Sequence, residues 1–298
     1  MLILEKKVSI IGGDLRIVYL VQMLVEDGFD VYTYGLEKAE DLENLKNVFI
    51  CKNEEETIKK SKLVISSIPF CKDEEFIKAP FSNKDILISD VTKYLNNKVF
   101  VAGSIPIKLY KLQEEINVQI IDLIKCEELA ILNSISTAEG AIQIAMEETN
   151  FTLHGSNILI LGFGRIGKVI AKMLQGVGAN VYCEARKNED LAWIKTYGYK
   201  EVPLSKLDDN LSNKDIIINT IPSIVLDENR LKLLDKNSLI IDLASKPGGV
   251  DQLAAVNQGI KVIWALALPG KVAPYSAAKC IKQTIYNEIK DKNTFFGV

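Results

Sequence analysis

The sequence predicts an α/β protein made of two doubly wound parallel-sheet domains joined by a hinge helix. Three observations predict it. The strand-like segments are continuous Val, Ile and Leu runs, which are typical of parallel strands covered on both faces. A unit of strand, glycine turn and helix occurs twice. The segments that follow it also recur in the same order in both halves. The 298 residues, of which 48% are hydrophobic, are enough for about two globular domains.

The repeat is visible in the letters. KKVSIIGGDLRIVYL at 6–20 is answered by SNILILGFGRIGKVIA at 156–171, and KLVISSIPF at 62–70 by DIIINTIPS at 215–223. We also pair ILISDVTK at 86–93 with LIIDLASK at 239–246, and KVFVAG at 98–103 with KVIWALALPG at 261–270. Each half is therefore expected to be one doubly wound unit, with ligands outside the carboxyl ends of its strands.

The domain boundaries follow from this repeat. We expect an N-terminal substrate or lid domain over 1–130, a linking helix within 131–154 and a cofactor domain over 155–275. The helical pattern of the link is clear from Ser136 onward, and Ser136 or Thr137 is a candidate cap. The segment 276–298 is expected to be helical at its start and to pack back on the N-terminal domain.

Residues 162–167, Gly-Phe-Gly-Arg-Ile-Gly, form the pattern GxGxxG between a predicted strand and a predicted helix. In this context the pattern is typical of a dinucleotide site of the Rossmann type. Gly162 allows the tight turn, Gly164 lets the pyrophosphate approach the backbone, and Gly167 lets the helix pack on the strand. Arg165 and Ile166 begin the helix whose amides bind the anion. The alternative is a purely structural glycine turn.

The first half has only Gly12-Gly13 followed by Asp14, without a third glycine. A carboxylate there would repel a pyrophosphate. We therefore expect the first half to have the fold without the dinucleotide site.

The strand NVYCEARK predicts which dinucleotide is bound. NAD enzymes often place an acid about 20 residues beyond the glycines, where it binds the adenosine ribose. Ala185 occupies that position here, and Arg186 and Lys187 follow it. Glu184 lies one residue early, so its side chain is expected on the other side of the strand. A cation without an opposing carboxylate favours the 2′-phosphate of NADP. The alternative is that Arg186 and Lys187 are only a solvated loop.

Other strand ends complete the expected pocket. The further cofactor contacts are Thr220, Ile221, Pro222, Ala244, Ser245, Leu268 and Pro269. The expected substrate contacts are Asp14, Arg16, Ser134 and Lys246. The candidate catalytic residues are Thr137, Glu139 and Lys271.

Basic side chains near the pocket point to a carboxylated substrate, while Thr137 and Glu139 can hydrogen-bond it or carry a proton. The alternative for this pair is an ordinary helix cap. Dehydrogenases that oxidise an alcohol need a base, commonly histidine. His154 is the one histidine and precedes the first strand of the second half, on the wrong side of the sheet. We expect a structural or surface role for it.

Composition excludes several other classes. Acidic and basic residues, 39 and 36, are well mixed, so there is no nucleic-acid stripe. The five cysteines are scattered without metal-ligand spacing, which predicts free thiols in a reducing cytoplasm and no metal site. No signal peptide or membrane span is expected.

The segments IGGDLR, NSISTAEGAI, HGSNILILGFGRIG, INTIPS, DLASKPGGVD and LPGKVAP resemble the family of dipicolinate synthase A subunits over nearly the whole chain. DLASKPGG and LPGKVAP are its most specific parts. The resemblance implies NADP-linked oxidation of a dihydrodipicolinate to dipicolinate, in the cytoplasm of the mother cell of a sporulating bacterium. It also implies that the partner is a flavoprotein-like B subunit. Because the ring becomes aromatic, no alkoxide is formed and a weak base or water suffices.

Two other functions stay open at this point. One is an NAD(P)-dependent 2-hydroxyacid or amino-acid dehydrogenase, which would need an acid–base group that the sequence does not supply. The other is a non-catalytic NADP-binding protein that only accompanies its B partner. We also leave a homo-oligomer open as an expectation.

Overall fold

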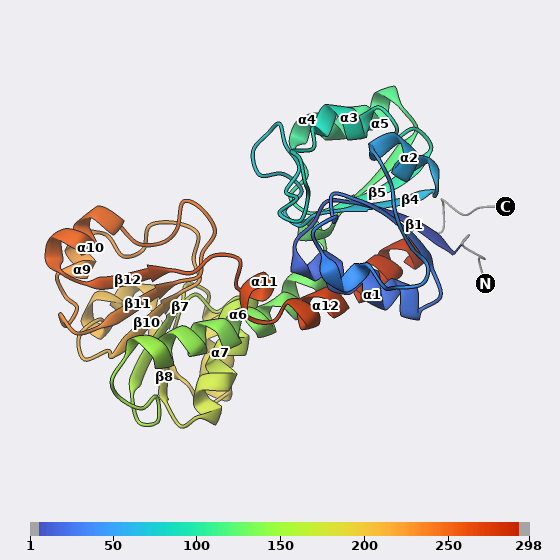
Figure 1. Ribbon diagram of the computed structural model, residues 1–298. Helices are drawn as coiled ribbons and strands as arrows, with labels where there is room; N and C mark the ends of the chain where they lie inside the picture. Colours follow the sequence, from blue (N-terminus) through green and yellow to red (C-terminus); the bar gives the residue numbers. More distant parts are fainter. Residues whose placement is uncertain (1–5, 292–298) are drawn as a thin grey trace. The chain divides into compact units, whose positions relative to one another are not determined.

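The computed structural model describes residues 6–291. The chain divides into two compact units. Unit 1 consists of Met1–Ala130 with Ala273–Val298, and unit 2 is Ile131–Val272. Each unit contains one six-stranded parallel sheet with helices on both faces (Figure 1). The predicted fold class is thus confirmed.

The two sheets have the same strand order. In unit 1 it is β3-β2-β1-β4-β5-β6, and in unit 2, read from the other edge, β9-β8-β7-β10-β11-β12. The unit 1 strands are β1 (Lys7–Ile11), β2 (Asp30–Tyr34), β3 (Val48–Ile50), β4 (Leu63–Ser66), β5 (Lys98–Ala102) and β6 (Val118–Asp122). The unit 2 strands are β7 (Asn157–Leu161), β8 (Asn180–Ala185), β9 (Lys200–Pro203), β10 (Ile216–Asn219), β11 (Leu239–Asp242) and β12 (Lys261–Trp264). The first three strands of each unit are added toward one edge of the sheet and the last three toward the other edge. The order therefore switches beside the first strand, which is where doubly wound sheets bind ligands.

The order corrects part of the predicted repeat. The segment 86–93 is not a strand, because Ile88–Thr92 forms the short helix α3. The partner of β11 is therefore β5, at 98–102, and the partner of β12 is β6, at 118–122. Residues 70–87 form an irregular loop, α3 follows it, and the chain re-enters the sheet only at Lys98. The segment 86–93 therefore packs on a face of the sheet and adds no strand to it.

Helices cover both faces of each sheet. Unit 1 has α1 (Leu15–Glu26), η1 (Glu40–Leu42), α2 (Glu54–Lys59), α3 (Ile88–Thr92), α4 (Ile107–Tyr110), α5 (Leu112–Glu115), η2 (Leu123–Lys125) and α12 (Pro274–Asp291). Unit 2 has α7 (Arg165–Gly176), α8 (Asn188–Thr196), η3 (Leu204–Lys206), η4 (Asp208–Asn210), α9 (Glu228–Leu231), α10 (Gln252–Gln258) and α11 (Leu268–Val272). No helix in residues 6–291 has the length and apolarity to cross a bilayer.

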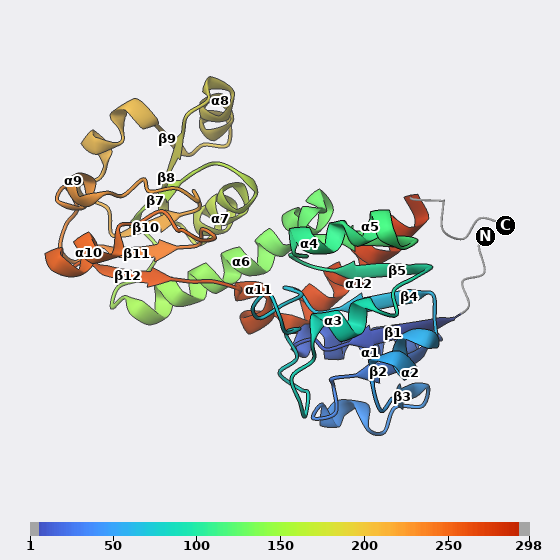
Figure 2. The same ribbon diagram turned by 90° about the horizontal axis from the view of Figure 1, so that it is seen from above.

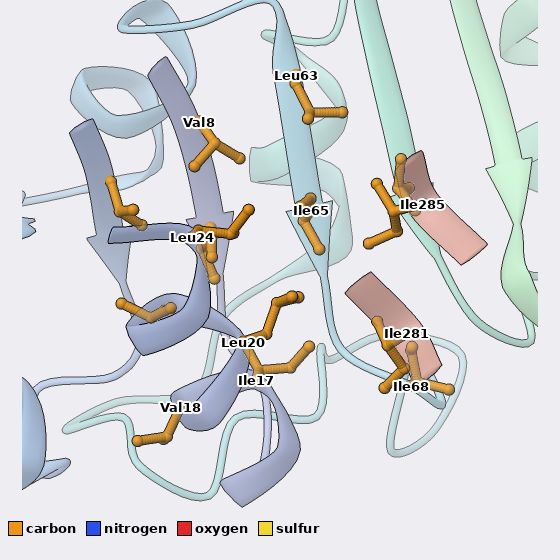
Figure 3. Packing of buried hydrophobic residues seen from close by; sticks show 14 of the residues in the cluster. Val8, Ile17, Val18, Leu20, Leu24, Leu63, Ile65, Ile68, Ile281 and Ile285 are labelled. Carbon is orange, nitrogen blue, oxygen red and sulfur yellow. The ribbon is translucent and has the colours of Figure 1, made fainter. Parts of the chain in front are cut away.

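The C-terminal helix α12 lies beside α1 on the sheet of unit 1 (Figure 2). Ile281 and Ile285 are buried in the same cluster as Leu20, Leu63 and Ile65 (Figure 3). At the C-terminal end of α1, the Asp27 carboxylate accepts hydrogen bonds from Lys282 Nζ at 2.8 Å and Tyr286 Oη at 2.6 Å. A helix that follows the whole of unit 2 in the sequence therefore completes the core of unit 1.

The helix α6 (Glu127–Glu148) continues through the boundary between the units. It begins well before Ser136, so the expectation that Ser136 or Thr137 caps it is wrong. Both lie within the helix, where their hydroxyls donate to the Asn133 carbonyl at 3.3 and 2.8 Å. Serine and threonine occur both as helix caps and within helices, where their hydroxyls bond to a carbonyl of the preceding turn. The sequence alone does not separate these two cases, which explains the error.

Candidate functional site

The glycine turn of unit 2 joins β7 to α7 at the carboxyl end of the central strand. Gly162 has φ +89°, a conformation that favours glycine. A Cβ on Gly167 would lie 2.1 Å from the Gly162 carbonyl oxygen, so the helix approaches the strand at a distance that only glycine allows. Gly164 occupies the cap position of α7, and a Cβ there would meet no atom within 4 Å. The cap position of α7 is thus open on the side of Gly164, which is where a GxGxxG turn lets a pyrophosphate approach the helix start.

The first residues of α7 have different environments. Arg165 is exposed, while Ile166 is half-buried and packs against the core between α7 and the sheet. The loop after β10 lies next to the turn, where Thr220 Oγ1 donates to the Leu161 carbonyl at 2.8 Å. Ile221 is half-buried and Pro222 is exposed. These predicted cofactor residues meet at the ends of the adjacent strands β7 and β10.

Glu184 lies beneath the same turn. Its Oε2 accepts a hydrogen bond from the Gly162 amide at 3.2 Å, and its Oε1 is buried without a hydrogen-bond partner. The residue is 1% exposed. Burial raises the pKa of this carboxyl, against the opposing effects of the Gly162 amide and the charges of Arg186 and Arg230.

The end of β8 carries the residues that the sequence assigned to adenosine recognition. Cys183 and Ala185 are buried on the α7 side of the sheet, whereas Tyr182 packs with the cluster on the other side. Because side chains alternate along a strand, Glu184 belongs to the face opposite Ala185, as expected. Arg186 and Lys187 follow the strand and are exposed. Within the described residues, neither side chain makes a hydrogen bond or ion pair.

The loop after β11 is held by two buried polar side chains, Asp242 and Asn219. Asp242 accepts hydrogen bonds from the amides of Ala244 at 3.1 Å and Gly249 at 2.8 Å. Asn219 Nδ2 donates to Asp242 at 2.8 Å and to the Ile221 carbonyl at 3.0 Å. This network fixes two of the loops that border the carboxyl edge of the sheet. Asn219 was missed because an asparagine at the end of an Ile run has no pattern of its own.

The remaining predicted residues of unit 2 lie on nearby loops and helices. Ala244 is buried and its carbonyl accepts a hydrogen bond from the Trp264 indole at 2.8 Å, while Ser245 and Lys246 are exposed. Leu268 begins α11 and is buried, where it covers the backbone of Gly140. Pro269 and Lys271 lie in the same short helix, half-buried and exposed respectively.

The predicted residues of α6 have unequal access to solvent. Ser134 is 1% exposed and its hydroxyl donates to the Ile131 carbonyl at 2.5 Å. Thr137 is half-buried with its hydroxyl turned to Asn133, whereas Glu139 is exposed. Asn133 Oδ1, one turn before Thr137, is buried without a partner. Glu139 therefore has the most accessible carboxylate or hydroxyl of these three candidates.

In unit 1 the charged residues after the glycine turn form a compact cluster. Arg16 donates from Nε to Asp14 Oδ1 at 3.0 Å and from Nη2 to Asp14 Oδ2 at 2.7 Å, and Nη2 also donates to the Ile68 carbonyl. Lys78 Nζ lies 3.2 Å from the same Asp14 Oδ2. Lys78 was missed because nothing in the sequence of its loop marks it. Asp14 also caps α1 by accepting from the Arg16 amide at 3.2 Å.

His154 lies away from the glycine turn within unit 2. It precedes β7 and is exposed, and a Cβ on Gly178 would lie 2.5 Å from its ring. Gly178 forms the turn before β8, so both residues belong to the amino end of the parallel strands. The glycine turn is at the carboxyl end. Within residues 6–291, no group of three His, Cys, Asp or Glu side chains is arranged to hold a metal ion.

A doubly wound sheet with a glycine-rich turn at its switch point defines a dinucleotide-binding domain of the kind found in dehydrogenases. Sequence comparison agrees. Residues 132–256 match the model of the D-isomer specific 2-hydroxyacid dehydrogenase NAD binding domain, and residues 7–124 match that of the N-terminal domain of the dipicolinate synthase A subunit. The chain is 31% identical over 281 residues to the dipicolinate synthase A subunit of Bacillus subtilis, covering 94% of both chains. It belongs to the family of dipicolinate synthase A subunits, and is an oxidoreductase with a nicotinamide dinucleotide domain.

Solved structures of two similar proteins support the same conclusion. The dipicolinate synthase A subunit from Bacillus halodurans superimposes with a TM-score of 0.89 at 30% identity, covering 97% of this chain and 99% of that one. The corresponding protein from Bacillus subtilis superimposes with a TM-score of 0.86 at 31% identity, covering 96% of both. Both units of the fold are therefore shared with these proteins.

Proposed function

We propose that this protein is the A subunit of a dipicolinate synthase and uses NADP to oxidise a dihydrodipicolinate to dipicolinate. The family membership and the dehydrogenase-type cofactor domain support this proposal. We further propose that it works with a B subunit, in the cytoplasm of the mother cell during sporulation. The word subunit in the relatives' names supports the partner.

The choice of NADP depends on one observation, the unequal accessibility of the groups at the end of β8. The guanidinium of Arg186 is exposed and makes no hydrogen bond or ion pair among the described residues. Glu184, the acid within the strand itself, is 1% exposed, so a ribose hydroxyl cannot reach its carboxyl to form a hydrogen bond. The methyl group of Ala185 offers no opposing charge. An accessible arginine without a competing acid favours a 2′-phosphate.

The residues present fit this dinucleotide. The amides at the start of α7 would hold the pyrophosphate beside Gly164, and Arg186 with Lys187 the 2′-phosphate. The loops at Thr220–Pro222 and Ala244–Ser245, together with Leu268 and Pro269, would border the ribose and nicotinamide. When bound, the nicotinamide supplies an acceptor for two electrons and one proton, as hydride. The aromatising ring also loses one proton, so the balanced products are pyridine dicarboxylate, NADPH and H⁺.

The chain's own residues have the simpler tasks of binding carboxylates and accepting that proton. We assign carboxylate binding to Lys246 and Lys271, which are exposed. We assign proton handling to Glu139, with Thr137 and Ser134 as hydrogen-bonding neighbours on α6. His154 has no part, because it lies at the opposite end of the strands from the glycine turn.

The cofactor assignment is tested with Arg186→Met. Calorimetric titration should show NADP affinity reduced roughly 10- to 100-fold, the usual effect of losing a charged hydrogen-bonding partner. Affinity for NAD should change little. Lys195→Met is a matched control, because Lys195 is an exposed cation at the other end of α8. Equal losses for NADP and NAD, or none for NADP, would contradict the assignment.

The reaction is tested by absorbance at 340 nm with freshly generated dihydrodipicolinate and NADP, with and without the B subunit. Formation of NADPH in the presence of this protein supports the proposal. Turnover of a 2-hydroxy acid or amino acid instead would indicate the dehydrogenase alternative. NADP binding without turnover of any of these substrates, even with B present, would indicate a non-catalytic partner.

A further inference from the structure

The glycine turn of unit 1 is covered by the chain itself. A Cβ on Gly12 would lie 3.1 Å from side-chain atoms of both Ile77 and Ala79, and the Gly13 amide donates to the Lys78 carbonyl at 3.1 Å. In unit 2 a Cβ on Gly162, the position equivalent to Gly12, would likewise meet side-chain atoms of the chain, at Thr220 and Ile221. What distinguishes unit 1 is that the Gly13 amide is bonded to the covering segment Ile77–Ala79, which brings Lys78 beside Asp14.

The charged side chains at this turn differ in how far they are paired and buried. Arg16 has a side chain that is 9% exposed, and its Nε and Nη2 are used by Asp14 and the Ile68 carbonyl. Arg16 and Asp14 thus neutralise each other. Burial opposes ionisation of Asp14, but Arg16 and Lys78 outweigh it and lower its pKa, so the carboxylate stays charged at neutral pH.

The positive charge of Lys78 is not neutralised within the cluster, because Arg16 already pairs with Asp14. Its side chain is 33% exposed, and its ammonium group has three donors, of which the structure uses one, at 3.2 Å. One anion and two cations leave the cluster with a net charge of +1, and the most accessible cation is Lys78. Arg16, which the sequence favoured for substrate binding, serves mainly to hold Asp14 and through it Lys78.

We infer that Lys78 is the residue of unit 1 that binds a substrate carboxylate, with Asp14 and Arg16 as the residues that position its ammonium group. The inference rests on the proposed function for the chemical class of the substrate, a small planar dicarboxylate. It assigns the specificity of unit 1 to a residue on the loop between β4 and β5 rather than to the glycine turn.

The test compares Lys78→Met, Lys78→Arg and Lys84→Met. Lys84 is the control, because it is an exposed cation of the same loop whose side chain makes no hydrogen bond or ion pair among the described residues. The readouts are KM and kcat for dihydrodipicolinate, calorimetric binding of pyridine-2,6-dicarboxylate and of NADP, and the melting temperature. Lys78→Met should raise KM and weaken dicarboxylate binding at least about 10-fold, the factor for about 1.4 kcal/mol. NADP affinity should be unchanged.

Lys78→Arg should restore most of the dicarboxylate binding, and Lys84→Met should behave as the wild type. A purely structural ion pair would instead lower the melting temperature and leave dicarboxylate affinity unchanged, which would overturn the inference. Absence of dicarboxylate binding by the wild type would also overturn it. If dicarboxylate binding depends on Lys78 but no NADPH forms, the proposed function fails while this inference holds. If NADPH forms and Lys78→Met is without effect, the proposed function holds and this inference fails.

Discussion

At the scale of single residues, Glu184 and Arg186 have opposite environments at the end of β8. Glu184 faces inward, where it accepts a hydrogen bond from the first glycine of the turn. Arg186 faces solvent. Glu184 thus has a structural role at this strand end, and the proposed recognition role belongs to Arg186. The sequence predicted the face of Glu184 from strand alternation, but it could not predict that the side chain would reach the Gly162 amide.

Glu184→Gln tests whether the buried carboxyl carries a cost. The folded-state pKa is raised above the ordinary value of 4.5, so both the folded and unfolded forms are protonated below that pH and no cost exists there. As pH rises through and beyond 4.5, the unfolded form ionises first and stability is lost. Glutamine keeps an acceptor for the Gly162 amide and never ionises. The melting temperature of Glu184→Gln relative to wild type should therefore increase as pH rises above about 4.5, until the carboxyl of the folded form also ionises. A pH-independent difference would show that the carboxyl is not perturbed.

At the scale of elements, the turn between β7 and α7 depends on what each glycine faces. Gly167 faces backbone, since a Cβ there would meet the Gly162 carbonyl. Gly164 faces open space, and so does Gly176 at the other end of α7. The pattern GxGxxG predicted the turn because spacing reflects these local contacts. The start of α6 was not predictable in the same way. Ser136 and Thr137 resemble cap residues in the sequence, but their hydroxyls bond to a carbonyl within the helix.

Gly164→Ala and Gly176→Ala form a matched pair. Neither new methyl group meets an atom within 4 Å, so both proteins should fold. In the last turn of α7, alanine should stabilise Gly176→Ala by about 0.5–1 kcal/mol, because glycine loses more backbone entropy. Gly164→Ala should leave the melting temperature nearly unchanged but reduce NADP affinity at least about 10-fold, because its methyl group projects where the pyrophosphate approaches. Differential scanning fluorimetry and titration measure both. Wild-type NADP affinity in Gly164→Ala would place the pyrophosphate elsewhere.

At the scale of the whole molecule, two units share one strand order but differ in their glycine turns. In unit 1 the Gly13 amide is bonded to the covering segment Ile77–Ala79, and Asp14 occupies the cap position of the helix. In unit 2 the cap position is Gly164, which faces open space. An identical topology therefore does not imply an identical ligand, because the loops at the strand ends decide what can approach.

This difference predicts one dinucleotide per chain. Titration with NADP should give a stoichiometry of one NADP per chain. Gly164→Ala should weaken that single binding event without revealing a second one. Asp14→Asn removes the carboxylate that stands at the turn of unit 1, yet it should not create a second site, because the covering segment remains. A stoichiometry of two per chain would show that the turn of unit 1 can open.

The sequence by itself determined the two parallel sheets, the place of the dinucleotide turn and the family, because these depend on local periodicity and on short motifs. It also predicted that Glu184 faces away from Ala185, since strand alternation is a local property. Only the tertiary structure decided that β5, rather than 86–93, is the partner of β11. It also revealed that Asn219 supports Asp242, that Glu184 lies beneath Gly162 and that Lys78 joins Asp14. The physical reason is that each of these contacts joins residues far apart in the chain, and their burial and charge exist only after the sheets have formed.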